Sequence, residues 1–563
     1  MKRTGVLFLA MIMMISCVFT GCGQKEANTG DTQASSEVKS EESVKDDVEQ
    51  IINVEFNEDM SSLNSAKMAE SYANTVIMET QEMLVRMENG TLQPAGAKSW
   101  SQSEDGLVWT FKIRDFKWSD DVAVKAEDYA FAVEAMLDPS TACPNAGMFY
   151  FIKGAKAFNT GEGDFQGVGV KAIDDKTLEF TLDYQVPYFL QLMNFANLVP
   201  LREDIYSAQA GTYGQDETTM VYSGPFYVEK WVKGSKIILA KNESYWDKDK
   251  VKLDKAIINI VKEEPTKMKM FNSKAIDIVT SVKGEYNTAL EKMANDGEII
   301  ALSGYQPRSA EVIFNTQDES GFFKNDKIRL AFSLAIDREA YVNTIAKGKV
   351  AAYGWVPYEI LLDDVKYREA TEGPLKTAMD KDPKALYEEG LAELGLDPAK
   401  EHEVTFLIKS ASTSERSNGE FYQDQWEKKL GVKVNIDVAS DNATFNKCVM
   451  EGQYQVCQSG WGADFNDPVN FLEMFETGNG NNGPFFSDEK FDELIALSRT
   501  EQDTQKRLEL FQEAEKILVA EKAAIAPVTF EKKSSYVQNY VKGVELPSFG
   551  PKFEFKNASI EGK

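Results

Sequence analysis

Strand-like and helix-like patterns alternate along this chain, and the alternation limits its fold to α/β lobes. Residues 107–113 alternate apolar and polar side chains, as a half-buried strand does. Residues 125–137 repeat their apolar side chains at helical spacing. Residues 176–182 predict another strand, and residues 226–240 predict a hairpin around Gly234. Because the chain has 563 residues, we expect two or three lobes.

The last part of the chain predicts two more helices. Ser487 is the expected N-cap of the first, because acidic residues and then helically spaced Phe491, Leu494 and Ile495 follow it. Residues 510–518 carry one apolar stripe at helical spacing. No internal repeat accompanies these patterns.

The first 21 residues have the pattern of an export signal. Lys2 and Arg3 precede an unbroken apolar run over residues 6–15, which is too short for a stable spanning helix. Two small residues then precede Cys22. This arrangement resembles a lipoprotein signal, in which cleavage frees Cys22 and its thiol receives a diacylglycerol. Cys17 is the alternative, and it would shorten the apolar run.

A polar segment separates this signal from the rest of the chain. Residues 23–50 contain no aromatic side chain and are rich in Ser, Glu, Asp and Lys, so they lack the apolar surface that folding requires. With Cys22, they predict a lipidated, flexible tether over residues 22–50. The folded part is expected to begin at Ile51. The predicted location is the extracytoplasmic face of the cell membrane.

The charge and the cysteines exclude some classes of protein. The formal net charge is −28, so the chain has no basic excess with which to displace counterions from nucleic acid. The three cysteines after the signal, Cys143, Cys448 and Cys457, lack the spacing of a metal site or a disulfide framework. Free buried thiols are expected, with a pair between Cys448 and Cys457 as the alternative.

Motifs of catalysis are missing from the sequence. His402 is the single histidine, and a zinc site of the H-E-x-x-H kind needs two on one helical face. No G-x-S-x-G elbow exists to position a serine beside it. A pair of carboxylates of the glycosidase type stays open, because acidic residues are abundant. We therefore expect no enzyme, no metal and no organic cofactor.

Residues 94–139 carry the most specific pattern in the chain. This segment resembles the hallmark region of family 5 extracellular solute-binding proteins, the oligopeptide- and dipeptide-binding components of ABC importers. The matching residues are Asp105, Gly106, Trp109, Thr110, Phe111, Arg114, Trp118, Ser119, Ala126 and Asp128. Asp121 stands where the family often has Gly, and Lys125 where it often has Thr. We expect these departures to alter a turn and a helix cap.

Ordered matches continue through most of the remaining chain, including the segments SGPFYVEKW, IRLAFSLAIDREAYVNTIAKG and GWGADFNDPVNFLEMF. The resemblance implies an α/β periplasmic-binding-protein type II fold, with two lobes around a ligand cleft and an extra domain inserted in the first lobe. Lobe I is expected over residues 51–94, 221–314 and 527–563. The inserted domain is expected over residues 95–220, and lobe II over residues 315–526.

The resemblance also implies a ligand site. The family motif G-W-x-A-D corresponds to Gly460, Trp461, Gly462, Ala463 and Asp464. The aspartate of that motif meets the peptide α-amino group, so Asp464 is expected to hold it, while Trp461, Gly462 and Ala463 line the cleft. Glu82, in ETQEMLVRM, corresponds to a family glutamate near the cleft. Gln458 occupies the position where some oligopeptide binders have an arginine that meets the peptide carboxylate.

Capture of short peptides and their delivery to an ABC permease with its ATPases is therefore the expected function, carried out by a monomer. A receptor for another solute, such as a sugar or a nickel chelate, is the alternative within the same class. A receptor for signalling peptides is a third. A secreted enzyme belongs to a different class, and hydrolysis of added peptides would favour it.

Overall fold

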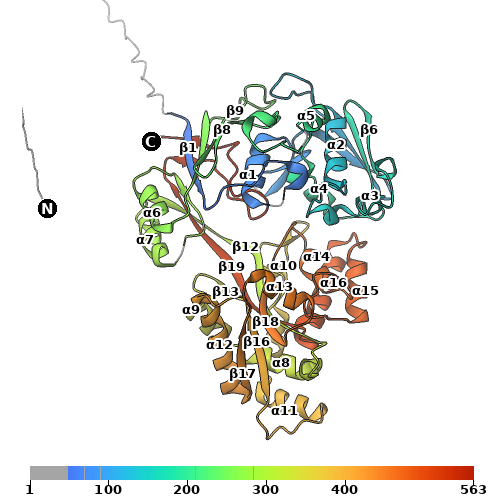
Figure 1. The fold of residues 1–563 in the computed structure, drawn as a ribbon, viewed down its shortest axis with the longest axis vertical. Helices are drawn as coiled ribbons and strands as arrows, with labels where there is room; N and C mark the ends of the chain where they lie inside the picture. Colours follow the sequence, from blue (N-terminus) through green and yellow to red (C-terminus); the bar gives the residue numbers. More distant parts are fainter. Residues whose placement is uncertain (1–48, 69, 89, 210, 283) are drawn as a thin grey trace, which may run out of the picture. The chain divides into compact units, whose positions relative to one another are not determined.

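The computed structural model describes residues 49–563 except residues 69, 89, 210 and 283. The predicted signal, the lipidation site Cys22 and nearly all of the tether lie outside the described residues. Figure 1 shows the arrangement of the described elements.

The first sheet joins the beginning of the folded chain to a much later segment. Its order is β1 (Ile51–Phe56), β10 (Lys255–Ile260), β9 (Lys236–Lys241) and β8 (Phe226–Val232), with β1 parallel to β10. Helix α1 (Ser71–Thr80) packs beside β8. We call the part built on this sheet lobe I. Because β1 and β8 belong to one sheet, the residues between them contain an insertion in lobe I.

The second sheet lies within that insertion. Its order is β4 (Ala97–Gln102), β5 (Val108–Ile113), β7 (Thr177–Thr181) and β6 (Val170–Asp174), all antiparallel. Helix α2 (Ala126–Leu137) packs against β6 and β7. Three residues of β5 that alternate along the strand, Trp109, Phe111 and Ile113, are buried in its core. We call this part the inserted domain.

The third sheet is the largest, and we call the part built on it lobe II. Its order is β11 (Ile278–Val279), β19 (Ile525–Gln538), β12 (Ile299–Phe314), β18 (Val456–Gly462), β16 (Glu403–Ile408) and β17 (Lys433–Val438). A short strand, β13 (Val350–Ala351), pairs with β19. Helices α8 (Asp326–Ala335), α11 (Pro383–Glu393) and α12 (Thr413–Leu430) pack on one another. Helices α15 (Glu489–Ser498) and α16 (Thr504–Lys516) form another pair.

Strands β12 and β19 are long and antiparallel, and they lie side by side in Figure 1. Their ladder is interrupted between Tyr305 and Ser309. Before the interruption, residues 299–305 pair only with β19. After it, β12 also pairs with β18, starting at Arg308. The predicted crossings near Asn315 and Pro527 fall just after β12 and within β19.

The secondary-structure predictions are confirmed for the strands at 107–113 and 176–182, the helix at 125–137 and the hairpin at Gly234, with ends that differ by a residue or two. The predicted N-cap Ser487 is wrong by one residue. Asp488 caps α15, because its carboxylate accepts a hydrogen bond from the backbone N–H of Phe491. Asp121 has φ 66°, the left-handed conformation that suits glycine and that aspartate tolerates.

Lys125 begins α2 without a side-chain cap of its own. Asp128, three residues later, accepts hydrogen bonds from the backbone N–H of Lys125 at 2.9 Å and from Trp118 Nε1 at 3.1 Å. The carboxylate thus satisfies the backbone N–H of the N-cap residue, whereas the backbone N–H of Asp128, which an N-cap threonine would accept, donates to the Lys125 carbonyl oxygen at 3.2 Å. The departure at Lys125 therefore leaves this helix end capped from inside the helix.

Several chemical groups have placements that bear on function. Cys143, Cys448 and Cys457 are free thiols. His402 lies with its Nε2 3.0 Å from the carbonyl oxygen of Asp397. In the described ranges, no group of three or more His, Cys, Asp or Glu side chains is arranged to hold a metal ion. A search of the same residues for helices long and apolar enough to cross a membrane found none.

Candidate functional site

The motif at residues 460–464 begins in the last three residues of the central strand β18 of lobe II and continues just past its end. The antiparallel register sets Trp461 opposite Ser309 and Gly462 opposite Arg308 on β12. Ala463 then donates its backbone N–H to the carbonyl of Pro307 at 2.8 Å. Pro307 lies within the interruption of the β12–β19 ladder. The motif is therefore bonded to β12 just before the point where β12 also begins to pair with β18.

Asn470 holds two motif residues in place. Its Oδ1 accepts hydrogen bonds from Trp461 Nε1 at 3.0 Å and from the backbone N–H of Asp464 at 3.2 Å. The Asn470 side chain is buried, so its geometry is fixed by the surrounding packing. The tryptophan and the aspartate are therefore set at a constant separation by one amide group.

The carboxylate of Asp464 is accessible to solvent but surrounded by protein. Desolvation raises the pKa of Asp464 above its ordinary value, and a hydrogen bond with Asn470 offsets part of that rise. Asp464 takes part in none of the ion pairs found between described residues. An accessible, partly desolvated carboxylate without a cationic partner favours binding of a cation.

Two cavities meet at Asp464. Cavity A, of about 390 Å³, is lined by lobe I, the inserted domain and lobe II. Its lining includes Asn74, Gln191, Tyr358, Glu359, Lys366, Asp464, Phe465 and Phe549. Cavity B, of about 230 Å³, is lined by Tyr150, Tyr184, Tyr188, Trp461, Asp464, Phe465 and Asn470, among others. Both walls of the cleft thus contribute to the space around one carboxylate.

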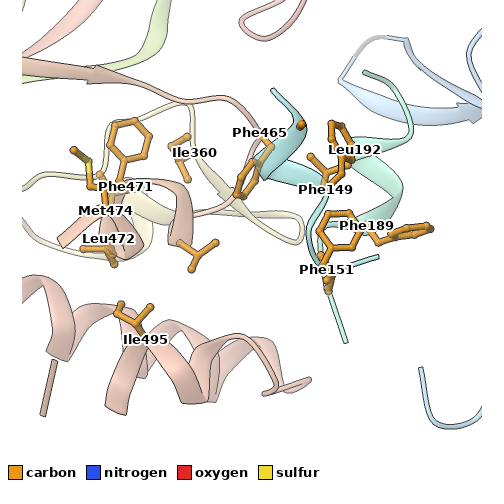
Figure 2. Packing of buried hydrophobic residues seen from close by; sticks show 14 of the residues in the cluster. Phe149, Phe151, Phe189, Leu192, Ile360, Phe465, Phe471, Leu472, Met474 and Ile495 are labelled. Carbon is orange, nitrogen blue, oxygen red and sulfur yellow. The ribbon is translucent and has the colours of Figure 1, made fainter. Parts of the chain in front are cut away.

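Phe465 separates the two cavities and joins lobe II to the inserted domain. Its ring stacks on Tyr188, with centroids 4.2 Å apart and an interplanar angle of 12°. Figure 2 shows Phe465 with Ile360 of lobe II on one side and Phe149 and Leu192 of the inserted domain on the other. Stacked aromatic pairs favour fixed geometry, so this contact ties lobe II to the inserted domain beside Asp464.

A larger cavity of about 550 Å³ lies on the other side of Tyr358, lined by Glu339, Lys349 and Arg368 among others. It contains none of the motif residues. Two of its basic side chains are already engaged, since Lys349 pairs with Glu531 at 3.2 Å and Arg368 pairs with buried Glu515. We therefore assign the candidate site to cavities A and B.

Sequence reasoning placed Glu82 near the cleft, and the structure gives its side chain other contacts. Glu82 is fully buried. Its carboxylate accepts hydrogen bonds from Trp246 Nε1 at 2.8 Å, from Tyr245 Oη at 3.2 Å and from Arg86 at 3.2 Å. It lines neither cavity A nor cavity B. Of the residues predicted from the sequence, Asp464 lines both cavities and Trp461 lines cavity B, whereas Gly462, Ala463 and Glu82 line neither.

Gln458 also turns away from both cavities. Its Nε2 donates to Tyr422 Oη at 3.0 Å and to Tyr341 Oη at 3.3 Å, on the side of the lobe II core. Sequence reasoning missed Lys366, Tyr358 and Phe549, which come from segments far from the motif. Only the tertiary fold brings them together, and no local pattern marks them.

Comparisons with known proteins identify the family. Residues 91–483 match the profile of the bacterial extracellular solute-binding proteins, family 5, middle region. The oligopeptide-binding protein OppA of Bacillus subtilis (strain 168) is 32% identical over 562 residues, covering 99% of each chain.

Solved structures agree in fold. A substrate-binding domain of an oligopeptide ABC transporter from Bacillus anthracis str. Ames has a TM-score of 0.71 and 33% identity, covering 91% of this chain and 99% of its own. Listeria monocytogenes OppA bound to peptide has a TM-score of 0.70 and 28% identity, with the same coverage. The predicted two-lobed type II α/β fold is thereby confirmed. The chain belongs to the bacterial extracellular solute-binding proteins of family 5.

Proposed function

We propose that this protein captures short peptides between its lobes and delivers them to an ABC importer. The observation that carries the proposal is Asp464, an accessible carboxylate without an ion-pair partner among the described residues, at the junction of two cavities lined by both lobes. A peptide α-amino group is a cation of matching charge, and a close charged pair adds affinity in a partly desolvated site. Relatives named for oligopeptide binding support this choice of ligand.

The ligand main chain is proposed to lie beside the motif loop, where Trp461, Gly462 and Ala463 line its path. Main-chain hydrogen bonds give affinity that does not depend on side-chain identity. The Gln458 side chain is held by two tyrosines, so it supplies no clamp for the peptide carboxylate. Lys366 is the one basic side chain among the described residues that line cavities A and B, and we assign it the weaker role of attracting that carboxylate.

Lobe closure is proposed to hold the peptide, with hinges in β12 and β19. The ladder between β12 and β19 is interrupted between Tyr305 and Ser309, so bending at this point disturbs the fewest hydrogen bonds between the two strands. A ligand that contacts both lobes stabilises the closed arrangement because it binds that arrangement better. The domain boundaries expected from the sequence are part of this proposal, except that the crossings between lobes are placed near Ser309 and Phe530 instead of Asn315 and Pro527.

The protein is further proposed to be an extracytoplasmic monomer, anchored through a lipid on Cys22 and a tether up to residue 50. Its partners would be the permease and ATPase subunits of the importer. Labelling of the expressed chain with radioactive palmitate tests the anchor. Label in the wild type and none in Cys22→Ala is the expected result. Equal label in both proteins would show that the lipid is attached to a residue other than Cys22.

Native mass spectrometry of residues 24–563 tests peptide capture. The protein would be measured as purified and after addition of a mixed library of di- to hexapeptides. We expect peptide adducts in the wild type, few in Asp464→Ala, and few for the same library with acetylated N-termini. A folded wild-type protein without any peptide adduct would refute peptide capture and direct the search to other solutes.

A further inference from the structure

A third cavity continues the proposed site on the far side of Trp461. Cavity C has a volume of about 380 Å³ and shares Trp461, Met474 and Asn481 with cavity B. Cavity B in turn contains Asp464. Cavity C therefore adjoins, across a shared wall, the cavity that contains Asp464.

A buried carboxylate lies in the wall of cavity C. Glu311 is only 1% exposed, and its Oε2 accepts no hydrogen bond from any described residue. Glu311 sits on β12 opposite Ser459 of β18, where the pairing of β12 with β19 shifts register between Ala310 and Glu311. A buried carboxylate without a partner is costly, so it is neutralised by a proton or by a cation, and the cavity beside Glu311 gives a cation access to it.

The rest of the wall is largely apolar. Phe445, Val449, Met474 and Phe475 are all buried side chains that line cavity C. An apolar passage with one acidic group suits a side chain that has an aliphatic stem and a charged end. Lysine and arginine side chains have this form. A neutral apolar side chain would fill the passage but leave Glu311 unpartnered.

We infer that cavity C is a side-chain pocket selective for a basic residue of the bound peptide, and that Glu311 determines this selectivity. The inference rests on the proposed function, because it assumes that a peptide is held at Asp464. It adds a preference for lysine or arginine at one ligand position. Main-chain capture alone would not supply that preference.

The electrostatic surroundings of Glu311 make this selectivity depend on pH. Burial raises the pKa of Glu311 to about 8, and the positive charges of Lys409 and Arg308 offset only part of that rise. An entering ammonium group favours the carboxylate, so binding below pH 8 releases a proton and becomes tighter as the pH rises. The other titratable groups that interact with Glu311 are Cys457, Tyr454 and Tyr422.

Lys409 is the nearest competing cation to consider. Its Nζ lies 5.4 Å from the centroid of the Phe445 ring, and it makes no ion pair with Glu311 within 4.0 Å. The Phe445 ring lines cavity C, whereas Lys409 is not among its lining residues. Its charge weakens the selectivity that Glu311 supplies, without removing it.

Calorimetric titration with matched peptides tests the inference. The ligands are tri- and penta-alanine hosts with a single lysine, or a single norleucine, at each position in turn. Norleucine has the unbranched stem of lysine without its ammonium group, so the ratio of the two affinities isolates the charge. The ratio also cancels any titration of Asp464 or of the peptide α-amino group. The proteins are the wild type, Glu311→Gln and Asn446→Lys, all covering residues 24–563.

At pH 8.5 we expect wild-type protein to bind one lysine peptide at least tenfold more tightly than its norleucine partner. The preference should shrink between pH 8.5 and pH 6.5. In Glu311→Gln it should fall to twofold or less at every pH, with binding of norleucine peptides retained. Asn446 is an exposed residue of cavity C, so Asn446→Lys should weaken only the lysine peptide, through repulsion at the rim.

Norleucine and lysine peptides that bind equally well to wild-type protein would overturn the inference and leave peptide capture intact. A lysine preference that persists in Glu311→Gln would do the same. If no peptide of either series binds, the proposed function itself fails. Failure of the side-chain selectivity and failure of peptide capture therefore give different results in this experiment.

Discussion

Two buried glutamates, one in each lobe, have similar burial but different partners. Glu82 of lobe I lies between Arg86, Tyr245 and Trp246, and Arg86 also pairs with Glu554 at 3.1 Å. Glu311 of lobe II has an oxygen without a partner and lines a cavity. A buried charge whose partners are all within the protein stabilises one arrangement of the fold. A buried charge that faces a cavity without a partner is available to a ligand.

The largest effect is expected when Arg86, the cation that pairs with Glu82, is removed. Arg86→Met keeps the aliphatic stem but leaves Glu82 and Glu554 buried without their shared cation. We expect the free energy of unfolding to fall by about 3–5 kcal/mol, as for other broken buried pairs. Urea unfolding at pH 7 measures the change.

Lys428→Met is the matched control. It removes a pair with Asp424 at 2.6 Å in which both side chains are exposed, so the expected loss is below about 0.5 kcal/mol. Equal losses in the two variants would show that burial does not distinguish these charges.

The next effect concerns Asp464, which is accessible where Glu82 is not. Asp464→Asn keeps the shape of the side chain and removes its charge. We expect peptide affinity to fall by about 2–4 kcal/mol, roughly 30- to 1,000-fold, because the α-amino group then binds without its counter-charge. Titration calorimetry with a free and an N-acetylated peptide measures this. The acetylated peptide should bind both proteins alike, and a loss for both peptides would contradict the assignment.

A smaller effect is expected for the stability of the protein without ligand. The folded-state pKa of Glu311, about 8, lies above its value in an unfolded chain. The stability that the protonated group contributes is therefore complete below about pH 4.3 and is lost as the pH rises through about 8. Glu311→Gln cannot ionise, so it should gain roughly 1–3 kcal/mol over the wild type between pH 5 and pH 8.

Thermal unfolding of both proteins across that pH range measures this gain. Glu79, whose pKa is also raised to about 8, is present in both proteins, so its contribution cancels. A melting-temperature difference that does not change with pH would mean that Glu311 has a cation partner within the folded protein.

The smallest effect is expected at Lys366, an exposed charge in the wall of cavity A. It already pairs with Glu369 at 3.0 Å, and both side chains are largely exposed. Lys366→Met should therefore lower affinity for a free-acid peptide by no more than about 1 kcal/mol, and salt should reduce the difference. An amidated peptide serves as the control. A tenfold or larger loss would make Lys366 a principal anchor of the peptide carboxylate.

Local patterns predicted the elements well where the pattern itself decides the structure. The alternation in residues 107–113 became β5 because three alternating side chains face one core. At α15, two adjacent residues were both able to cap the helix, and only the geometry showed that Asp488 does so. The motif at 460–464 could be found because it is contiguous in the sequence.

The remaining site residues depend on contacts between distant segments. Glu311 precedes the apolar residues Val312, Ile313 and Phe314, and nothing in that order tells whether its carboxylate meets an arginine or a cavity. Glu82 is a second case, because the segment that contains Tyr245 and Trp246 lies far from it in the sequence, and only the tertiary fold brings those donors to its carboxylate.

The register of β12 and β19 has a further consequence for how the chain is connected. Ser309 pairs with Phe530, so the two ends of the lobe II segment lie on adjacent strands, about 5 Å apart. The segment from residue 309 to residue 530 therefore starts and ends at neighbouring positions of one ladder. It can change length or sequence without altering the path of the chain through lobe I. The same closeness makes residues 309–530 a natural unit for transfer between homologous proteins, since a single pair of junctions in one ladder suffices to join it.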